Sequence, residues 1–230
     1  MACRHTVHMR LSSSEFERVI GELTRPLNGQ LPRPWISDLK DPLQAAVFIV
    51  GQNQAKTFPE VRLPHERHVD GLFNRNGESA RGIYDEMTGG KQSRTRTNID
   101  MSNSLLKAAK VRGVLETNVV CYSTPMSSDL RSALHVGGRD KGTEIFQTLL
   151  RFIKPKVLIA HGAGTRAELS KVLSVKLPEV PISPMPPQFT VIGELTICII
   201  PSLAPPKWNS WCRWAPTYLG EVAAAVSRQI

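Results

Sequence analysis

The chain has 230 residues, of which 41% are hydrophobic, and lysine plus arginine outnumber aspartate plus glutamate by 29 to 20. This length and apolar content predict a single domain over residues 1–230 that buries a full core. No apolar run reaches the roughly 18 residues of a membrane helix, and none follows the basic start of the chain. We therefore expect no membrane contact, no signal peptide and an intracellular location, in the cytoplasm or nucleoid if the source is bacterial.

The first half of the chain predicts three helices and one strand. A capping box formed by Ser12 and Glu15 begins a helix that ends at Pro26, and a Pro-rich linker follows over residues 31–35. Residues 46–51 are apolar and rich in β-branched types, which is typical of a strand buried on both faces. A long polar loop is expected over residues 52–76, and helices over 78–88 and 99–112.

The second half repeats the alternation of strand and helix. Strands are expected at 114–121, 156–160, 189–192 and 195–200, with a possible hairpin across Gly193, and helices at 141–153, 165–175 and 217–228. This alternation predicts an α/β fold, a three-layer α/β/α sandwich around a mostly parallel sheet of about four strands.

The net charge of +9 and the isoelectric point near 9.7 indicate a polyanionic partner, bound by neutralising its phosphates. A basic surface without such a partner is the alternative. Basic residues gather in a loop over 90–97, where Arg94 and Arg96 are candidate contacts to DNA, and Lys207 lies among tryptophans near the end of the chain.

The four cysteines are Cys3, Cys121, Cys198 and Cys212. They are widely spaced and form no Cys-x-x-Cys pair. We therefore predict no zinc or iron–sulfur site, no disulfide framework and no other cofactor.

Polar and small residues follow the predicted parallel strands at their carboxyl ends. In an open α/β sheet these ends meet at one edge, where ligands bind. The residues concerned are Gly51, Gln52, Asn53, Asn118, His161 and Ser202. Gly51 lets a ligand or backbone come close, and the amides that follow it offer hydrogen bonds without charge.

The order of these segments resembles the uracil-DNA glycosylase superfamily over most of residues 40–228. Residues 51–55 (Gly-Gln-Asn-Gln-Ala) resemble its first motif, which begins Gly-Gln-Asp-Pro in one branch and has Asn as its third residue in others. Residues 117–121 (Thr-Asn-Val-Val-Cys) resemble the second strand, 156–169 the strand–Gly–helix unit, and 200–202 (Ile-Pro-Ser) the final His-Pro-Ser loop. The resemblance implies an enzyme that hydrolyses the N-glycosidic bond of uracil or a related base in DNA, without an obligate protein partner.

The resemblance also implies roles for single residues. Asn118 would read the base edge, because its amide offers both a donor and an acceptor. Phe73 would stack on the base, with Phe58 as the second candidate, although ordinary core packing is the alternative for both. Gln52 would donate its backbone N–H to the base, and Asn53 would position the attacking water. Because an amide is no strong base, we expect a slower enzyme than the Asp-bearing branch.

Three features depart from the family. Ile200 stands where the family usually has His, so His161 is the candidate to support the leaving base, with a structural role as the alternative. In the final loop, Ser202 would contact DNA and Leu203 would insert into the duplex. The nearby tryptophans, Trp208 and Trp211, would stack on an unpaired base or pack in the core. Cys121 follows the strand Asn as in the iron–sulfur branch, but the other ligands are absent from the sequence.

Two other functions stay open. The chain could be a catalytically inactive DNA-binding relative, which the missing His favours. It could also be an α/β domain that binds a nucleotide or small molecule, although the sequence has neither a dinucleotide glycine pattern nor a phosphate-loop Gly-Lys-Ser/Thr.

Overall fold

The computed structural model describes residues 13–230. Its first element, α1 (Ser13–Leu23), buries Phe16, Ile20 and Leu23, which recur at helical spacing. The helix is therefore where its apolar pattern predicts it, while the predicted capping residue Ser12 lies outside the described residues.

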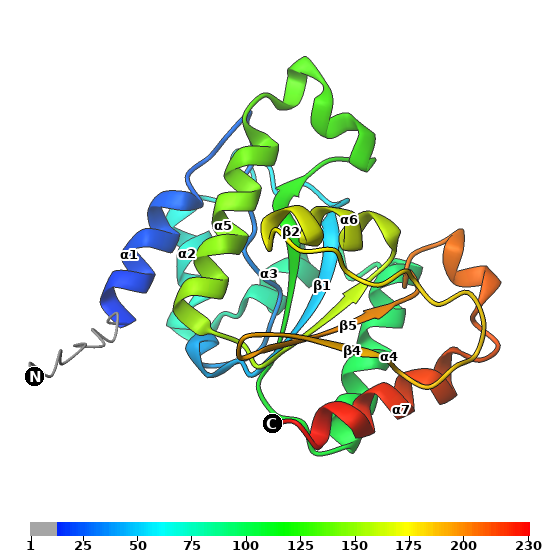
Figure 1. Cartoon of the computed structure of the whole chain (residues 1–230). Helices are drawn as coiled ribbons and strands as arrows, with labels where there is room; N and C mark the ends of the chain where they lie inside the picture. The colour runs from blue at the N-terminus through cyan, green and yellow to red at the C-terminus, as the bar shows by residue number, and fades with distance from the viewer. Residues whose placement is uncertain (1–12) are drawn as a thin grey trace, which may run out of the picture.

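The centre of the molecule is a five-stranded sheet in the order β2-β1-β3-β5-β4 (Figure 1). The strands are β1 (Val47–Gln54), β2 (Val114–Ser123), β3 (Val157–His161), β4 (Phe189–Ile192) and β5 (Leu195–Ile200). All neighbouring pairs are parallel except β4 with β5, which form the hairpin across Gly193. The predicted α/β class is confirmed, and the strand count exceeds the expected four by the antiparallel edge strand.

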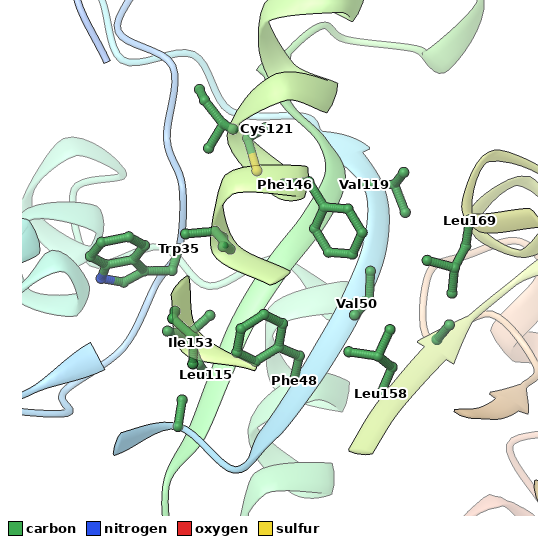
Figure 2. Close-up of a cluster of buried hydrophobic side chains, with 14 of the residues drawn as sticks. Trp35, Phe48, Val50, Leu115, Val119, Cys121, Phe146, Ile153, Leu158 and Leu169 are labelled. Carbon is green, nitrogen blue, oxygen red and sulfur yellow. The ribbon is translucent and has the colours of Figure 1, made fainter. Parts of the chain in front are cut away.

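Helices cover both faces of this sheet (Figure 1). On one face, α1, α5 (Gly138–Ile153) and α6 (Ala163–Val172) share an apolar cluster with Phe48 and Val50 of β1 (Figure 2). On the other face, α4 (Arg94–Ala108) and α7 (Ala215–Ser227) pack on Val47 and Ile49. Alternate residues of β1 thus bury opposite faces, which explains its unbroken apolar run.

The prediction of a long loop over residues 52–76 is wrong. Strand β1 continues to Gln54, and α2 (His65–Leu72) forms inside the stretch, followed by α3 (Ala80–Met87). Helix α2 buries His68, Gly71 and Leu72, so its inner face carries an imidazole and a glycine in place of two large apolar residues. Its mostly polar sequence therefore lacked the apolar periodicity from which a helix is recognised.

The basic loop over 90–97 is also partly helical. Ser93 caps α4 by accepting a hydrogen bond from the Arg96 backbone N–H, so Arg94 and Arg96 lie in the first turn of that helix. Short 3-10 helices complete the chain at Pro42–Gln44, Arg75–Gly77, Ser127–Arg131, Ala133–His135 and Lys207–Ser210. Among the described residues no helix combines the length and apolarity that crossing a membrane demands.

Candidate functional site

Three polar or small residues lie at one level across the carboxyl ends of the central strands. Gly51 of β1 pairs with Asn118 of β2. Val50 pairs with Ala160, so the next residue of β3, His161, stands beside Gly51. On its other side His161 pairs with Ile200 of β5. The parallel register therefore places Asn118, Gly51 and His161 side by side at this edge.

A cavity of about 530 Å³ opens over this row. It is lined by all six residues that the sequence placed at strand ends: Gly51, Gln52, Asn53, Asn118, His161 and Ser202. Lys207 and Arg96 line it as well. The structure thus brings the strand-end loops together as expected, and the cavity has a volume that suits a small organic ligand.

Gly51 is required by the close approach of Asn118. A Cβ atom at position 51 would lie 2.5 Å from Oδ1 of Asn118 and 3.3 Å from Nε2 of His161. Within the described part of the chain, the side-chain amide of Asn118 has no hydrogen-bond partner. A half-buried amide with neither its donor nor its acceptor engaged is available to a ligand.

The two amides of the first motif point in different directions. Asn53 donates from Nδ2 to Oγ1 of Thr124 at 2.8 Å, which ties it to the loop after β2. Gln52 lies against the first turn of α6, where a Cβ atom on Gly164 would collide with its side chain. Each side chain is therefore positioned by a different neighbouring element, and both still line the cavity.

His161 is held as a neutral imidazole. It is only 9% exposed, and burial lowers its pKa to about 4. Its Nδ1 is buried without a hydrogen-bond partner. Near neutral pH the ring can therefore donate one N–H to a ligand but brings no positive charge.

Several residues proposed from the sequence lie away from the cavity. Phe73 packs against Phe16 and Trp35 at centroid distances of 5.9 and 5.8 Å, and it does not line the cavity. Phe58 is 1% exposed in the cluster under α3. The structure thus places both rings in packing roles.

The final loop is also more buried than expected. Leu203 is fully buried beside α7, so the prediction that it inserts into a duplex is wrong for this conformation. Trp211 is buried and donates from Nε1 to the Ser202 carbonyl at 2.8 Å, which makes it a core residue that fixes the loop. Ile200 is fully buried in the same cluster and does not reach the cavity. Trp208 packs at the edge of that cluster.

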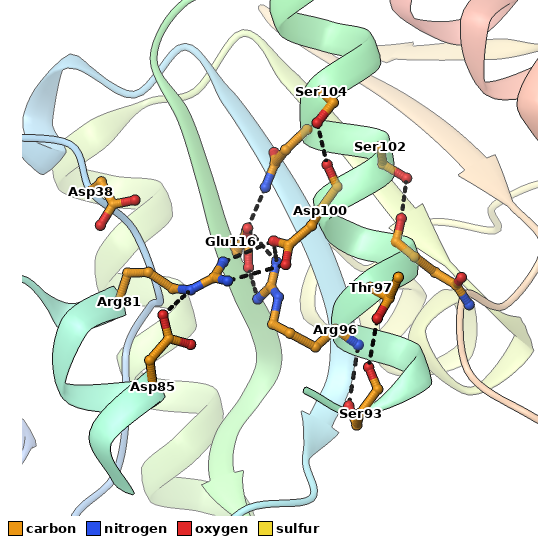
Figure 3. A network of polar contacts seen from close by, with 12 residues as sticks. Asp38, Arg81, Asp85, Ser93, Arg96, Thr97, Asp100, Ser102, Ser104 and Glu116 are labelled. Carbon is orange, nitrogen blue, oxygen red and sulfur yellow. Dashed lines mark hydrogen bonds and ion pairs between the residues drawn. The ribbon is translucent and has the colours of Figure 1, made fainter. Parts of the chain in front are cut away.

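Arg96 is no free cation for phosphates, contrary to the sequence-based prediction. It is 3% exposed and forms ion pairs with Glu116 of β2 and, at 2.8 Å, with Asp100 of its own helix (Figure 3). Arg81 of α3 joins the same network through Asp100 at 2.8 Å (Figure 3). Burial raises the pKa of Glu116, and Arg96 offsets part of that effect. Arg94, in contrast, is exposed.

The lining also includes charged and aromatic residues that the sequence did not single out, namely Arg33, Lys56 and Tyr84. Tyr84 is an aromatic residue at the cavity wall and is 6% exposed. Arg33 lies in the segment 31–35, which its prolines marked only as a linker. Lys56 directly follows the motif at residues 51–55, whereas Arg33 and Tyr84 reach the site from elements outside the strand-end motifs and gave no local signal.

The lining of the cavity carries one sign of charge. Its basic members are Arg33, Lys56, Arg96 and Lys207, and no aspartate or glutamate lines it. A small recess beside it reaches Glu116, which Arg96 neutralises. The site therefore favours a ligand with negative charge or strong acceptors.

None of the three cysteines within residues 13–230 lines the cavity. Burial raises the pKa of Cys121 to about 11 and that of Cys198 to about 12, so both are unreactive thiols near neutral pH. Cys3 lies outside the described residues. Across residues 13–230, no three histidine, cysteine, aspartate or glutamate side chains group as metal ligands would.

Comparison of the chain with models of protein families gives no match, and comparison with curated protein sequences gives none either.

Proposed function

We propose that this protein is a monofunctional DNA glycosylase that hydrolyses the N-glycosidic bond of uracil or a closely related base in DNA. The observation that carries the proposal is the row of Asn118, Gly51 and His161 on one cavity at the carboxyl edge of the sheet. The resemblance of the sequence to the uracil-DNA glycosylase superfamily, in the order of its motifs, supports the same function.

In this proposal the target nucleotide leaves the base stack and enters the cavity. Extrusion costs a few kcal/mol, which contacts to the flipped base must offset. The free amide of Asn118 meets one acceptor and one donor on the uracil edge. Tyr84 supplies a ring at the cavity wall, and stacking on such a ring contributes roughly 1–3 kcal/mol per base.

Bond cleavage then depends on stabilising charge more than on a strong base. Departure of the base leaves cationic character on the sugar and negative charge on the base oxygen. The cavity supplies the positive field of its basic residues, an N–H from neutral His161 and the amide of Asn53 to hold water. Because no carboxylate lines the cavity, water is not activated by a strong general base, and we expect slow turnover.

The absence of a carboxylate among the lining residues also favours a second candidate, a catalytically inactive relative that binds DNA at the same cavity. Such a protein would recognise an extruded base without releasing it. Base release and binding are therefore separate measurements.

The test is incubation with a uracil-containing oligonucleotide, with detection of both the free base and the abasic strand. An oligonucleotide of the same sequence with thymine in place of uracil is the control, and excess chelator is present in a parallel reaction. The glycosylase proposal predicts uracil release, little thymine release and no effect of the chelator. Uracil-dependent binding without release would support the inactive relative. If the protein neither binds the oligonucleotide nor releases uracil, both proposals are rejected.

A further inference from the structure

Arg33 is built into the cavity wall from a rigid segment. It stands between Pro32 and Pro34, and its backbone N–H donates to the Cys121 carbonyl at 3.2 Å. Its own carbonyl accepts a hydrogen bond from the buried side chain of Gln54. The backbone of Arg33 is thus fixed against β1 and β2, which carry Gly51 and Asn118.

The guanidinium of Arg33 packs against two aromatic rings. Its carbon lies 4.3 Å from the ring centroid of Phe58 and 5.3 Å from that of Tyr84. The side chain makes one hydrogen bond, from Nη1 to the Lys56 carbonyl at 3.2 Å. Neither Nε nor Nη2 makes a hydrogen bond to another described residue. Nε is fully buried, and Nη2 is not.

Arg33 lacks the anion that a buried arginine normally requires. It is 3% exposed, and no ion pair within residues 13–230 includes it. Arg96 is equally buried on the same cavity but is neutralised by Glu116 and Asp100. Burial lowers the pKa of Arg33 to about 10, so its charge persists near neutral pH. A buried cation without a counterion is costly, and the cavity lining has no carboxylate to supply one.

We propose that Arg33 is the oxyanion receptor of this cavity and binds a phosphate or carboxylate group of the ligand. Because Nη1 donates to the Lys56 carbonyl and Nε is buried, Nη2 is the group of the guanidinium left to meet a ligand. A charge-assisted hydrogen bond from Nη2 suits an oxygen of a carboxylate or phosphate. The rings of Phe58 and Tyr84 pack against the guanidinium and restrict its orientation, so little side-chain entropy is lost on binding.

This inference rests on the proposed function only in placing a DNA nucleotide in the cavity. Two parts of such a ligand can carry the oxyanion. One is a backbone phosphate beside the extruded base, and the other is a carboxylate on the pyrimidine ring of an acidic lesion. Both use the same Nη2 group of Arg33, and matched ligands distinguish them.

The experiment is calorimetric titration of the full-length protein with two ligand pairs at fixed, low ionic strength. Deoxyuridine 5′-monophosphate against deoxyuridine isolates the phosphate, and orotate against uracil isolates the ring carboxylate. Each pair is measured for the wild type, Arg33→Met and Arg33→Lys. Arg112→Met removes the same charge from an exposed position at the opposite edge of the sheet and is the matched control.

We expect the oxyanionic member of at least one pair to bind the wild type about tenfold or more tightly than its neutral partner. Arg33→Met should abolish that preference, Arg33→Lys should weaken it because an ammonium does not place a donor where Nη2 lies, and Arg112→Met should preserve it. The pair that shows the preference identifies the source of the oxyanion. If Arg33→Met fails to fold, Arg33→Lys alone decides.

The proposal is overturned if the wild type prefers neither oxyanion, or if the Arg33 variants keep the wild-type preference. A wild type that releases uracil from DNA but shows no oxyanion preference would contradict this inference and leave the proposed function standing. An Arg33-dependent preference for the oxyanion without uracil release would support this inference and contradict the proposed glycosylase activity.

Discussion

At the scale of single residues, the site depends on one missing side chain. Gly51 has no Cβ, and the amide of Asn118 occupies the space that a Cβ would need. The contacting atom is the far end of a short side chain, which can turn away. A larger residue at position 51 would therefore displace the amide before it disturbed the sheet.

We predict that Gly51→Ala lowers uracil excision at least about tenfold while costing only about 1 kcal/mol of stability. Displacing the Asn118 amide removes its alignment with the base but leaves the apolar core in place. Single-turnover excision and urea unfolding measure the two effects. Gly21→Ala is the matched control, because a Cβ at position 21 of α1 meets open space. Unchanged excision by Gly51→Ala would show that the amide position is irrelevant.

Ile200 stands where the resembled family has a His that supports the leaving base. Because Ile200 is fully buried, a His at this position would not reach the cavity. We predict that Ile200→His destabilises the protein by about 2–3 kcal/mol, because it buries an imidazole in an apolar cluster, and does not raise the excision rate. Thermal unfolding with single-turnover kinetics measures both; faster excision by a folded variant would contradict this placement.

At the scale of elements, a buried ion pair fastens α4 to the sheet. Arg96 of α4 reaches Glu116 of β2, and Asn103, about two turns further along the helix, donates to the same carboxylate. Glu116 shares the face of β2 that carries Asn118, two residues on. The pair therefore holds the cavity wall against the strand that carries Asn118.

We predict that Glu116→Gln lowers the free energy of unfolding by about 3 kcal/mol, because it leaves Arg96 buried with an incomplete counter-charge. The control Asp85→Asn breaks the more exposed pair with Arg81 and should cost less than about 1 kcal/mol. Equal losses in urea unfolding would show that burial of the Arg96 pair is unimportant.

The sequence predicted the elements whose apolar residues follow a regular period. It located all five strand segments, although it expected only about four strands in the sheet, and the helices α1, α3, α5, α6 and α7 within a few residues. It missed α2, whose buried face includes His68 and Gly71, and it placed the start of α4 too late. Those elements are fixed by contacts with distant parts of the chain, which local pattern cannot reveal.

The candidate site divides in the same way. Gly51, Asn118 and His161 were recognisable because parallel strands bring their carboxyl ends to one edge. Arg33 and Tyr84 were not, because they arrive from a linker and from α3. The burial of Leu203 and the pairing of Arg96 with Glu116 were equally hidden, since both depend on neighbours far away in the sequence.

At the scale of the whole molecule, two buried histidines should make stability depend on pH. Burial lowers the pKa of His68 and of His161 to about 4, whereas the ordinary value is 6.5. Between these values the unfolded chain binds more protons than the folded one, so stability falls as the pH falls. Above about pH 6.5 the contribution of both histidines is constant.

We predict that the free energy of unfolding declines from pH 6.5 to pH 4 by up to about 1.4 kcal/mol per pH unit for each histidine. His161→Gln should remove one histidine's share of the slope, which urea unfolding at several pH values measures. If His161→Gln leaves the slope unchanged, His161 is not held neutral by the fold.

The central claim is that Asn118 reads a flipped base in this cavity, and its most direct test is Asn118→Ala. Affinity for DNA arises mostly from phosphate contacts, whereas the amide touches only the extruded base. Single-turnover excision of uracil and equilibrium binding of the same oligonucleotide are measured for both proteins. We predict a loss of excision on the order of 10–100-fold with nearly unchanged DNA affinity. Equal losses in excision and binding, or excision as fast as that of the wild type, would contradict the assignment of the site.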